Sequence, residues 1–476
     1  MLLAGGNAVD GALAAMLCSC VCEPLLTGLG AGGYMLVHLP GRDPVLLDFF
    51  VEAPGREVDP HTPGELIPVS VSFGDAVQVF NIGPASVGTY GVPAGVCAAA
   101  ARFGRMSLGE LVQPAVRHAR AGVQISRQQG YLLEILGGIV TSSTESAALF
   151  APAGRVLGVD ERLVQPDLAA ALELLASEGA DPFYRGEPAA RIADWVRSRG
   201  GILSRADLEA FRVIDRRPVS VGYRGRRILT NPPPSAGGIL IARALAELES
   251  GPRPPDSERL VEVMERTQAL RTPEFLDGLD DPGFIERFLA GGAGPLGSTT
   301  HTSVIDGEGA ACSVTCSNGS CSGVIVPGTG VHLNNMLGEQ DLNPLGFHTF
   351  PPGRRLPSMM APTIVLRDGD PELVLGSAGS NRIRSAIIQT VVRALDEGMD
   401  ARAAVEAPRL HFEDGIVYAE PGLDVSALER AGRTVARFRE PNLFFGGVQL
   451  AGRTVGGRFH GAGDPRRGGE AVVLYL

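Results

Sequence analysis

The stretch GSTTHTSVIDGEGAACSVT, residues 297–315, decides the fold of this chain. Two strand-like runs, 299–305 and 310–317, flank the tight turn DGEG. We therefore predict a β-hairpin whose strands belong to a larger sheet. Thr299 and Thr300 open the first strand, where the β-propensity of threonine alone would account for them.

A second interpretation of Thr299 is catalytic. A threonine hydroxyl is a weak nucleophile unless a base lies beside it, and the stretch offers no obvious general base. If the chain is cut between Ser298 and Thr299, the new α-amino group, with an ordinary pKa of roughly 7.7–8.0, becomes that base. The Thr299 hydroxyl, aimed at the preceding carbonyl, would itself drive the cut. One residue would then supply both nucleophile and base.

Composition excludes several classes of function. The chain has 476 residues, with 44% hydrophobic and 20% charged side chains, which is typical of a globular protein with a large core. A formal net charge of −11 argues against a nucleic-acid partner, which needs a basic face. The sequence contains no lysine, so all 42 basic residues are arginine. Mechanisms that need a lysine amine, such as a Schiff base or a phosphate-loop lysine, are therefore excluded.

The seven cysteines are an odd number, and Cys18, Cys20 and Cys22 stand together in CSCVC. They match neither the disulfide framework of a secreted protein nor the paired C-x-x-C spacing of a zinc site. We therefore expect buried free thiols, no metal and a cytoplasmic location. We also expect no membrane partner, because no apolar stretch is long enough to cross a bilayer and no signal-peptide pattern opens the chain.

Helical patterns dominate the first part of the chain and strand patterns the second. The first helix is predicted to follow the capping residue Asn7, with Asp10 three residues on, and to stop at Pro24. Strands at 33–40 and 44–50, helices over 108–211 and a hairpin near 219–230 follow, and a strong helix occupies 381–398. The predicted strands of the second part are 299–305, 310–317, 363–367, 372–376, 433–438, 446–451, 457–460 and 470–475.

Other motifs have ordinary explanations beside their functional ones. GLGAGG at 28–33 matches a dinucleotide fingerprint, but a helix precedes it and a strand follows, which is the reverse of the required order. Close backbone packing explains these glycines better. Eight scattered histidines form no H-E-x-x-H motif, and nothing supports a Ser-His-Asp triad. LGSAGSNRI at 375–383 lies between a strand and a helix, which suits either an oxyanion hole or a plain glycine turn.

Motifs along nearly the whole chain together resemble the gamma-glutamyltranspeptidase family. They include GGNAVDGALAA, EPLLTGLGAGGYMLVH, NPPPSAGG, TTHTSVID, LNNMLGE, PSMMAPTIV, GSAGSNRI and GAGDPRRGG, in the family's order. The resemblance implies an α+β fold, a four-layer αββα sandwich of the N-terminal-nucleophile hydrolase type, without a cofactor. It also implies a precursor that cuts itself into a helix-rich large chain, 1–298, and a strand-rich small chain, 299–476, which together form one domain.

The family's catalytic residues carry over onto this sequence by position. Thr299 matches the nucleophile and new N-terminus, and Ser298–Thr299 matches the processed bond. Ser317 matches a hydroxyl that hydrogen-bonds the nucleophile. Gly379 and Ser380 match the two glycines whose N–H groups form the oxyanion hole.

The substrate-binding residues carry over only in part. Asn318 matches an asparagine that contacts the substrate, Glu339 the acidic residue that receives the α-amino group, and Ser358 the first of two serines near the α-carboxylate. Three positions depart from the family. The arginine that clamps the donor's α-carboxylate is Phe50, the second serine is Met359, and a glutamine or glutamate after the paired asparagines is Met336. Loss of a bidentate arginine leaves a bound carboxylate unpaired, which costs about a few kcal/mol.

Three functions are therefore open. The first is a γ-glutamyl hydrolase or transferase, glutathione hydrolase-like, which cleaves a small-molecule γ-glutamyl or related amide through an acyl-enzyme. The second is an amidase of the same mechanism with a non-glutamyl acyl group, as in the related cephalosporin acylases. The third is an unprocessed, non-catalytic relative.

Overall fold

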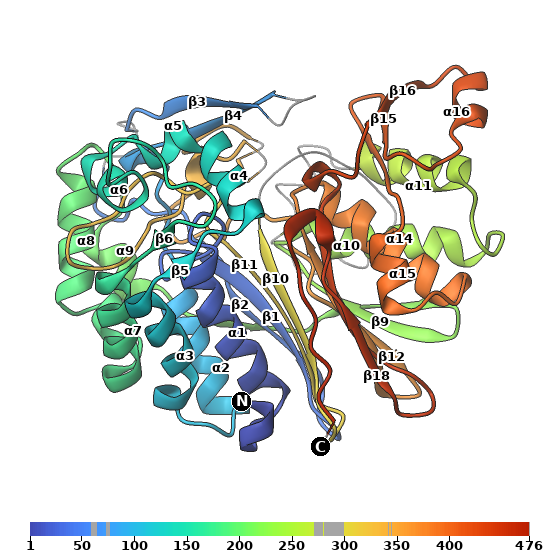
Figure 1. Ribbon diagram of the computed structural model, residues 1–476, viewed down its shortest axis with the longest axis horizontal. Helices are drawn as coiled ribbons and strands as arrows, with labels where there is room; N and C mark the ends of the chain where they lie inside the picture. The colour runs from blue at the N-terminus through green and yellow to red at the C-terminus, as the bar shows by residue number, and fades with distance from the viewer. Residues whose placement is uncertain are drawn as a thin grey trace.

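The computed structural model describes residues 1–58, 64–72, 77–270, 279, 299–340, 342–343 and 345–475 of the chain. Two large β-sheets lie at its centre, and helices lie outside them (Figure 1). The five-stranded sheet has the order β10 (Thr300–Ile305), β11 (Ala311–Ser317), β1 (Gly32–His38), β2 (Val45–Phe49) and β7 (Ile214–Arg216). The six-stranded sheet has the order β18 (Phe459–Ala462), β17 (Gly447–Arg453), β13 (Asp370–Ala378), β12 (Thr363–Arg367), β9 (Arg226–Thr230) and β8 (Val219–Tyr223).

Smaller sheets and the helices surround this centre. The remaining strands are β3 (Ile67–Ser72), β4 (Val77–Ile82), β5 (Val123–Gln124), β6 (Arg162–Leu163), β14 (Leu410–Glu413), β15 (Ile416–Ala419) and β16 (Thr434–Arg437). The helices are α1 (Ala8–Cys22), α2 (Val92–Phe103), α3 (Leu108–Ala121), α4 (Arg127–Ile135), α5 (Gly137–Val140), α6 (Thr144–Phe150), α7 (Pro166–Glu178), α8 (Glu187–Arg197), α9 (Arg205–Ala210), α10 (Ala236–Glu249), α11 (Ser257–Ala269), α14 (Arg382–Asp396), α15 (Ala401–Glu406) and α16 (Ser426–Arg430). None of the described helices is long and apolar enough to cross a membrane.

The predicted hairpin forms, as β10 and β11. Its turn is closed by Asp306, whose Oδ1 accepts the N–H groups of Glu308 at 3.0 Å and Ala310 at 2.9 Å. The other oxygen, Oδ2, accepts the N–H of Ala8 at 2.9 Å, at the start of α1. One carboxylate therefore shapes the hairpin and fixes it against α1.

Helix α1 begins as the sequence predicts. The Asn7 side chain accepts the N–H groups of Val9 and Asp10, and Asp10 accepts the N–H of Asn7 at 2.8 Å, so the two residues form a capping box. The helix ends at Cys22, before Pro24, and β1 follows GLGAGG. A Cβ on Gly30 would lie 2.3 Å from the His332 carbonyl oxygen, so close backbone packing accounts for that glycine.

Alternate residues of the central strands pack on opposite faces. Met35 and Val37 of β1 belong to the core that α1, α2, α3 and α7 share, whereas Tyr34 and Leu36 belong to the core that includes the six-stranded sheet, α10 and α14. The second face of the five-stranded sheet therefore meets the other sheet. Ser313 confirms this contact, because its hydroxyl donates to the Leu375 carbonyl of β13 at 3.1 Å.

Most predicted strands appear within two residues of their expected bounds, but one prediction is wrong. Residues 470–475 have no regular structure, and Val472 and Tyr475 are 81% and 84% exposed. The apolar, β-branched run there reads as a strand, but β18 pairs only with β17 among the described strands. Strand propensity without a pairing partner does not make a strand.

Candidate active site

Thr299 lies immediately before β10 and is 3% exposed. The sheet register pairs Thr300 with Cys316, Cys316 with Gly33, and Gly33 with Phe49. The next pair in this register is Gly32 with Ser317. Continuing the register by one residue on the two flanking strands adds Thr299 and Phe50. Thr299, Ser317, Gly32 and Phe50 therefore form the next row across the sheet. The three side chains of that row point toward the second sheet, with about 4.8 Å between neighbouring strands. The register thus places Ser317 beside Thr299 and Phe50 about 14 Å away.

The Ser317 hydroxyl accepts the N–H of Gly319 at 3.0 Å and is buried. His301, two residues after Thr299 on the same face of β10, is the nearest imidazole in the sequence. Its Nδ1 bonds the Thr315 hydroxyl at 2.7 Å and its Nε2 bonds the Ser303 hydroxyl at 2.9 Å. Burial lowers the pKa of His301 to about 3, so the ring is neutral at physiological pH with both nitrogens in use. His301 therefore holds the sheet together and is not poised as a base for Thr299.

The turn after β13 has an unusual backbone conformation at the two residues that the sequence assigns to an oxyanion hole. Gly379 and Ser380 have φ values of +109° and +68°, and the second is unusual for a residue with a side chain. The carbonyls of both residues accept N–H groups from the first turn of α14, at 3.1 Å from Arg382 and 2.9 Å from Ile383. Because a trans peptide directs its N–H opposite to its carbonyl, the Ser380 N–H points away from the helix. Ala378, the residue before this turn, lines the same cleft as Thr299.

Glu339 is a buried carboxylate in the loop beyond β11. Its Oε1 accepts the Ser320 N–H at 3.0 Å and the Ser320 hydroxyl at 3.2 Å. Within the described part of the chain, no arginine or histidine forms an ion pair with it, and burial raises its pKa. A buried carboxylate held only by neutral donors is suited to receive a cation. Nearby, Asn318 donates to the His332 carbonyl at 3.3 Å, and its buried Oδ1 has no hydrogen-bond partner among the described residues.

The three departures from the family pattern are all buried in the same large hydrophobic core. Phe50, Met336 and Met359 are all at most 4% exposed and belong to the same core, and Phe50 stacks on Tyr34 with ring centroids 5.3 Å apart. Arg355 reaches this region, and its guanidinium is already paired with carboxylates of the chain.

Arg355 pairs with Asp48 at 3.2 Å and Glu52 at 3.0 Å, and it donates to the Phe50 carbonyl at 2.9 Å. Its other nitrogen donates to the carbonyls of Asp48 and Arg212. Because its charge is already matched by two carboxylates, Arg355 does not replace the missing clamp arginine.

A Ser-His-Glu constellation exists, but it lies in the core. Ser385 Oγ bonds His411 Nδ1 at 2.8 Å, and His411 Nε2 lies 3.3 Å from Glu413 Oε2. All three side chains are at most 5% exposed, and Ser385 lies inside α14 rather than on a sharp turn. Asn381, which follows the turn residue Ser380, donates to Glu413 at 2.5 Å. The constellation therefore braces that turn from behind and has no access to a substrate.

The structure brings several predicted site residues together. Thr299 and Ser317 are neighbours in one row of the sheet. The residue before the turn 379–380, Ala378, lines the same cleft as Thr299. Asn318 and Glu339 lie in the segment that follows Ser317. Ser358 has different partners: its hydroxyl accepts the Met360 N–H at 3.0 Å and its carbonyl accepts N–H groups at the start of α10. Ser298 lies outside the described residues, so the structure does not show the predicted cleavage bond.

Two charged residues of the Thr299 cleft could not be recognised from the sequence. Glu23 and Arg467 line it together with Thr299 and Thr300. Glu23 follows α1, and Arg467 is the second arginine of DPRR, a motif whose two arginines look alike in the sequence. In the described part of the chain, no group of three or more His, Cys, Asp and Glu side chains is arranged to hold a metal. The seven cysteines are free thiols, four of them buried.

Comparison with known proteins agrees with this arrangement. The sequence model described as gamma-glutamyltranspeptidase matches residues 1–474. The acylase ACY 1 proenzyme of Pseudomonas sp. (strain SE83) is 31% identical, with 100% of this chain and 90% of that protein aligned. The glutathione hydrolase proenzyme of Escherichia coli (strain K12) is 30% identical, with 100% and 89% aligned.

Among solved structures, cephalosporin acylase from Bacillus halodurans has a TM-score of 0.85 at 25% identity, covering 100% of this chain and 93% of its own. Helicobacter pylori gamma-glutamyltranspeptidase has a TM-score of 0.50 at 26% identity, covering 60% and 86%. In sequence, hydrolases and acylases are thus similar to this chain to about the same degree. The chain belongs to the gamma-glutamyltranspeptidase family.

Proposed function

We propose that this chain is an autoprocessed amide hydrolase whose nucleophile is the N-terminal Thr299 of a small chain, 299–476. The partner in the same molecule is the large chain, 1–298, within a four-layer αββα sandwich. The position of Thr299 supports this proposal. It lies at the end of an edge strand, faces the second sheet and has a buried serine hydroxyl beside it.

In the proposed reaction, the nucleophile, the base and the oxyanion donors all belong to the chain. Thr299 Oγ attacks the amide carbonyl, and the Thr299 α-amine accepts the hydroxyl proton. The N–H groups of Gly379 and Ser380 stabilise the oxyanion, and Ser317 orients the nucleophile. The C–N bond breaks as the proton passes to the leaving nitrogen. Water, or another amine, then attacks the acyl-threonine ester and releases the acyl group.

We propose further that the acyl half needs no α-carboxylate. The observation that carries this is the burial of Phe50, Met336 and Met359 in the hydrophobic core, at positions where family members hold polar groups, together with the engagement of Arg355 by two carboxylates. A carboxylate bound there would lose water without gaining a cation, which costs about 1–3 kcal/mol or more. The substrate is therefore an amide with a less polar acyl group, as the acylase relatives suggest.

A γ-glutamyl hydrolase or transferase is the second candidate. Glu339 favours it, because a buried carboxylate without a paired cation fits the α-amino group of a glutamyl donor. The two candidates differ in one chemical group, since both accept an amine on the acyl half but only the second requires the carboxylate.

Four 4-nitroanilides separate the candidates, because they vary the two groups independently. They are butyryl, 4-aminobutyryl, glutaryl and γ-glutamyl anilide. We expect each compound without a carboxylate to have a kcat/KM about 10-fold or more above its carboxylate-bearing counterpart. If γ-glutamyl anilide is the best substrate and glutaryl anilide follows, the apolar-acyl proposal is wrong and the glutathione hydrolase-like function stands.

Variants at Phe50 test the cause of the preference. Phe50→Arg places a guanidinium in the row of Thr299, so we expect the glutaryl to butyryl ratio of kcat/KM to rise. Phe50→Leu is the matched control, which keeps the site apolar and should keep the ratio. If no anilide is hydrolysed and the chain remains uncut, the third function, a non-catalytic relative, is favoured.

A further inference from the structure

The carbonyl of Ala378 controls the direction of the Gly379 N–H, one of the two groups proposed to stabilise the oxyanion. The two groups belong to the same peptide unit, and a trans peptide directs its N–H opposite to its carbonyl. Ala378 is the last residue of β13, and Gly379 has a φ of +109°, so the chain leaves the sheet at this peptide. Whatever holds the Ala378 carbonyl therefore sets the direction of the Gly379 N–H.

A buried hydroxyl holds this carbonyl. Ser377 is 0% exposed, and its Oγ donates to the Ala378 carbonyl at 2.9 Å while it accepts the N–H of Gly447 at 3.1 Å. Because a serine hydroxyl has a single proton, the bond accepted from Gly447 leaves that proton for the carbonyl. Ser377 thus ties the end of β13 to the first residue of β17, beside the pair Ala378 and Gly447 in the sheet.

Gly446 lies against the same carbonyl. A Cβ on Gly446 would lie 2.9 Å from both the Ala378 carbonyl oxygen and Ser377 Oγ, and its φ of +85° favours glycine. From the other side, a Cβ on Gly379 would lie 2.8 Å from the Gly446 Cα. The two backbones are therefore in direct contact. The Ala378 carbonyl oxygen faces Gly446, and the Gly379 N–H faces away from it.

The η5 turn (Leu443–Phe445) leads directly into Gly446 and is held by guanidinium groups. Each of its three carbonyls accepts an N–H from a different arginine: Arg467 to Leu443 at 3.3 Å, Arg382 to Phe444 at 3.0 Å and Arg409 to Phe445 at 3.3 Å. The contact of Arg467 leaves donor capacity unused, since its buried Nε has no hydrogen-bond partner among the described residues.

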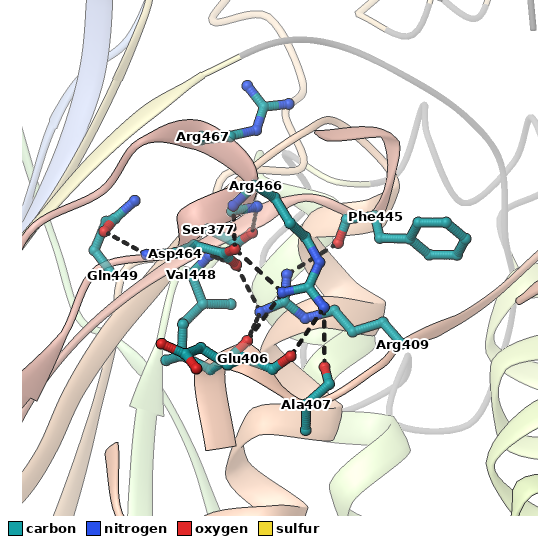
Figure 2. Close-up of polar contacts among 12 residues, drawn as sticks. Ser377, Glu406, Ala407, Arg409, Phe445, Val448, Gln449, Asp464, Arg466 and Arg467 are labelled. Atoms are coloured by element: carbon teal, nitrogen blue, oxygen red, sulfur yellow. Dashed lines mark hydrogen bonds and ion pairs between the residues drawn. The ribbon is translucent and has the colours of Figure 1, made fainter. Parts of the chain in front are cut away.

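An ion-pair network anchors these elements. Its pairs are Arg409–Asp464 at 2.7 Å, Arg466–Asp464 at 3.2 Å and Arg466–Glu420 at 2.5 Å. Asp464 also accepts the N–H of Val448 at 2.9 Å, in the strand that Gly447 begins. Figure 2 shows Arg409 and Arg466 together at Asp464, whereas Arg467 extends away from them. The network therefore fixes both η5 and the start of β17, which together hold the Ala378 carbonyl.

We propose that Ser377 is a positioning residue for the oxyanion hole, which acts through the Ala378 carbonyl to direct the Gly379 N–H at the oxygen of the tetrahedral intermediate. This inference rests on the proposed function and deepens it. Ser377 is not among the described residues that line the Thr299 cleft. It therefore affects the steps in which negative charge develops on the carbonyl oxygen, and it leaves the binding of planar ligands unchanged.

The first test replaces the hydroxyl. Ser377→Ala should lower kcat/KM for butyryl anilide at least about 10-fold, because the oxyanion donor loses its direction. The matched control is Thr329→Val. The buried Thr329 hydroxyl also donates to a carbonyl, that of Val326 at 2.8 Å, and accepts an N–H, that of Val331 at 3.2 Å, but it lies outside the cleft. This control should keep the wild-type kcat/KM.

Propylboronic acid provides a readout that a purely structural role would not change. Thr299 Oγ forms a bond to boron, its proton passes to the α-amine and no bond to boron breaks, so a tetrahedral adduct resembling the intermediate results. Butyrate has the same alkyl chain but stays planar. Ser377→Ala should weaken inhibition by the boronate by the same factor as kcat/KM and leave the inhibition constant of butyrate within about 2-fold of wild type.

Gly446→Ala is the second variant, because its Cβ would push against the Ala378 carbonyl, and the same pattern is expected. It decides the question by itself if Ser377→Ala does not fold. Equal losses of boronate and butyrate binding would overturn the positioning role. A kcat/KM for Ser377→Ala equal to wild type would also overturn it, while the proposed function would stand. A wild-type protein that hydrolyses no anilide and binds no boronate would instead contradict the proposed function itself.

Discussion

Replacement of Glu339 by glutamine tests the recognition of the acyl half most sharply. Glutamine has the shape of glutamate, and its amide oxygen still accepts the N–H and hydroxyl of Ser320, which lie 3.0 and 3.2 Å from Glu339 Oε1. The change therefore removes the charge and keeps the local hydrogen bonds. We expect Glu339→Gln to lose the preference for acyl groups that carry an ammonium.

The magnitude follows from the burial of Glu339, which is 2% exposed and forms no ion pair with any described residue. A hydrogen bond to a charged partner contributes about 1.5–3 kcal/mol, which corresponds to about 10-fold to 150-fold in kcat/KM. The assay compares two substrates, the aminobutyryl and the butyryl anilide, and the measured quantity is the kcat/KM for the first divided by the kcat/KM for the second. In Glu339→Gln this ratio should fall by that factor, whereas the exposed control Glu440→Gln should keep it.

The pH dependence of the same ratio provides an independent check. Burial raises the pKa of Glu339 above its ordinary value of 4.5, so the carboxylate is protonated on acidification sooner than an exposed glutamate would be. The wild-type ratio should therefore collapse as the pH falls through this raised pKa, and the glutamine variant should show no such step. An unchanged ratio in Glu339→Gln at neutral pH would refute the assignment of Glu339 to the acyl amine.

Two further predictions concern catalysis and stability. Ser317→Ala removes the hydroxyl beside the nucleophile. It should lower the single-turnover rate of acylation by about 10-fold, which corresponds to the contribution of one hydrogen bond to a charged centre. An acylation rate equal to that of the wild type in fully processed protein would contradict the role of Ser317 in orienting Thr299. Asp464→Asn breaks the buried pairs with Arg409 and Arg466 and should lower the free energy of unfolding by about 3–5 kcal/mol in denaturant titrations. Burial acts to raise the pKa of Asp464, but the two arginines hold it below its ordinary value. The stabilisation of the folded state by the Asp464 carboxylate is therefore complete above the pKa of aspartate in the unfolded chain, about 3.9. It is lost as the pH falls through the lower pKa that Asp464 has in the folded protein. The Asp464→Asn variant should lack this acid-dependent loss of stability.

Local sequence signals predicted the elements that carry the site. The Asn7–Asp10 capping box, the Asp306 turn and the glycine-rich turn before α14 each depend on residues within a few positions of one another. The same holds for β10 and β11, which pair through a short turn. These elements place Thr299, and they were predictable because their hydrogen bonds are local.

Tertiary partners decided the features that the sequence could not predict. Arg466 and Arg467 are identical neighbours in DPRR, and only the three-dimensional positions of Glu420 and Asp464 make the first structural and leave the second available. Phe50 could be recognised as a departure from the family, but the engagement of Arg355, 305 positions away, could not. The residues at 470–475 had strand propensity without a partner strand.

The intact masses and N-terminal sequences of the purified protein test the origin of the nucleophile directly. We predict two chains, the smaller of which begins at Thr299, and a single uncut chain without amide turnover for Thr299→Ala. A wild-type protein that hydrolyses amides as one uncut polypeptide, or that is cut at a different bond, would contradict the proposal that Thr299 becomes the reactive terminus.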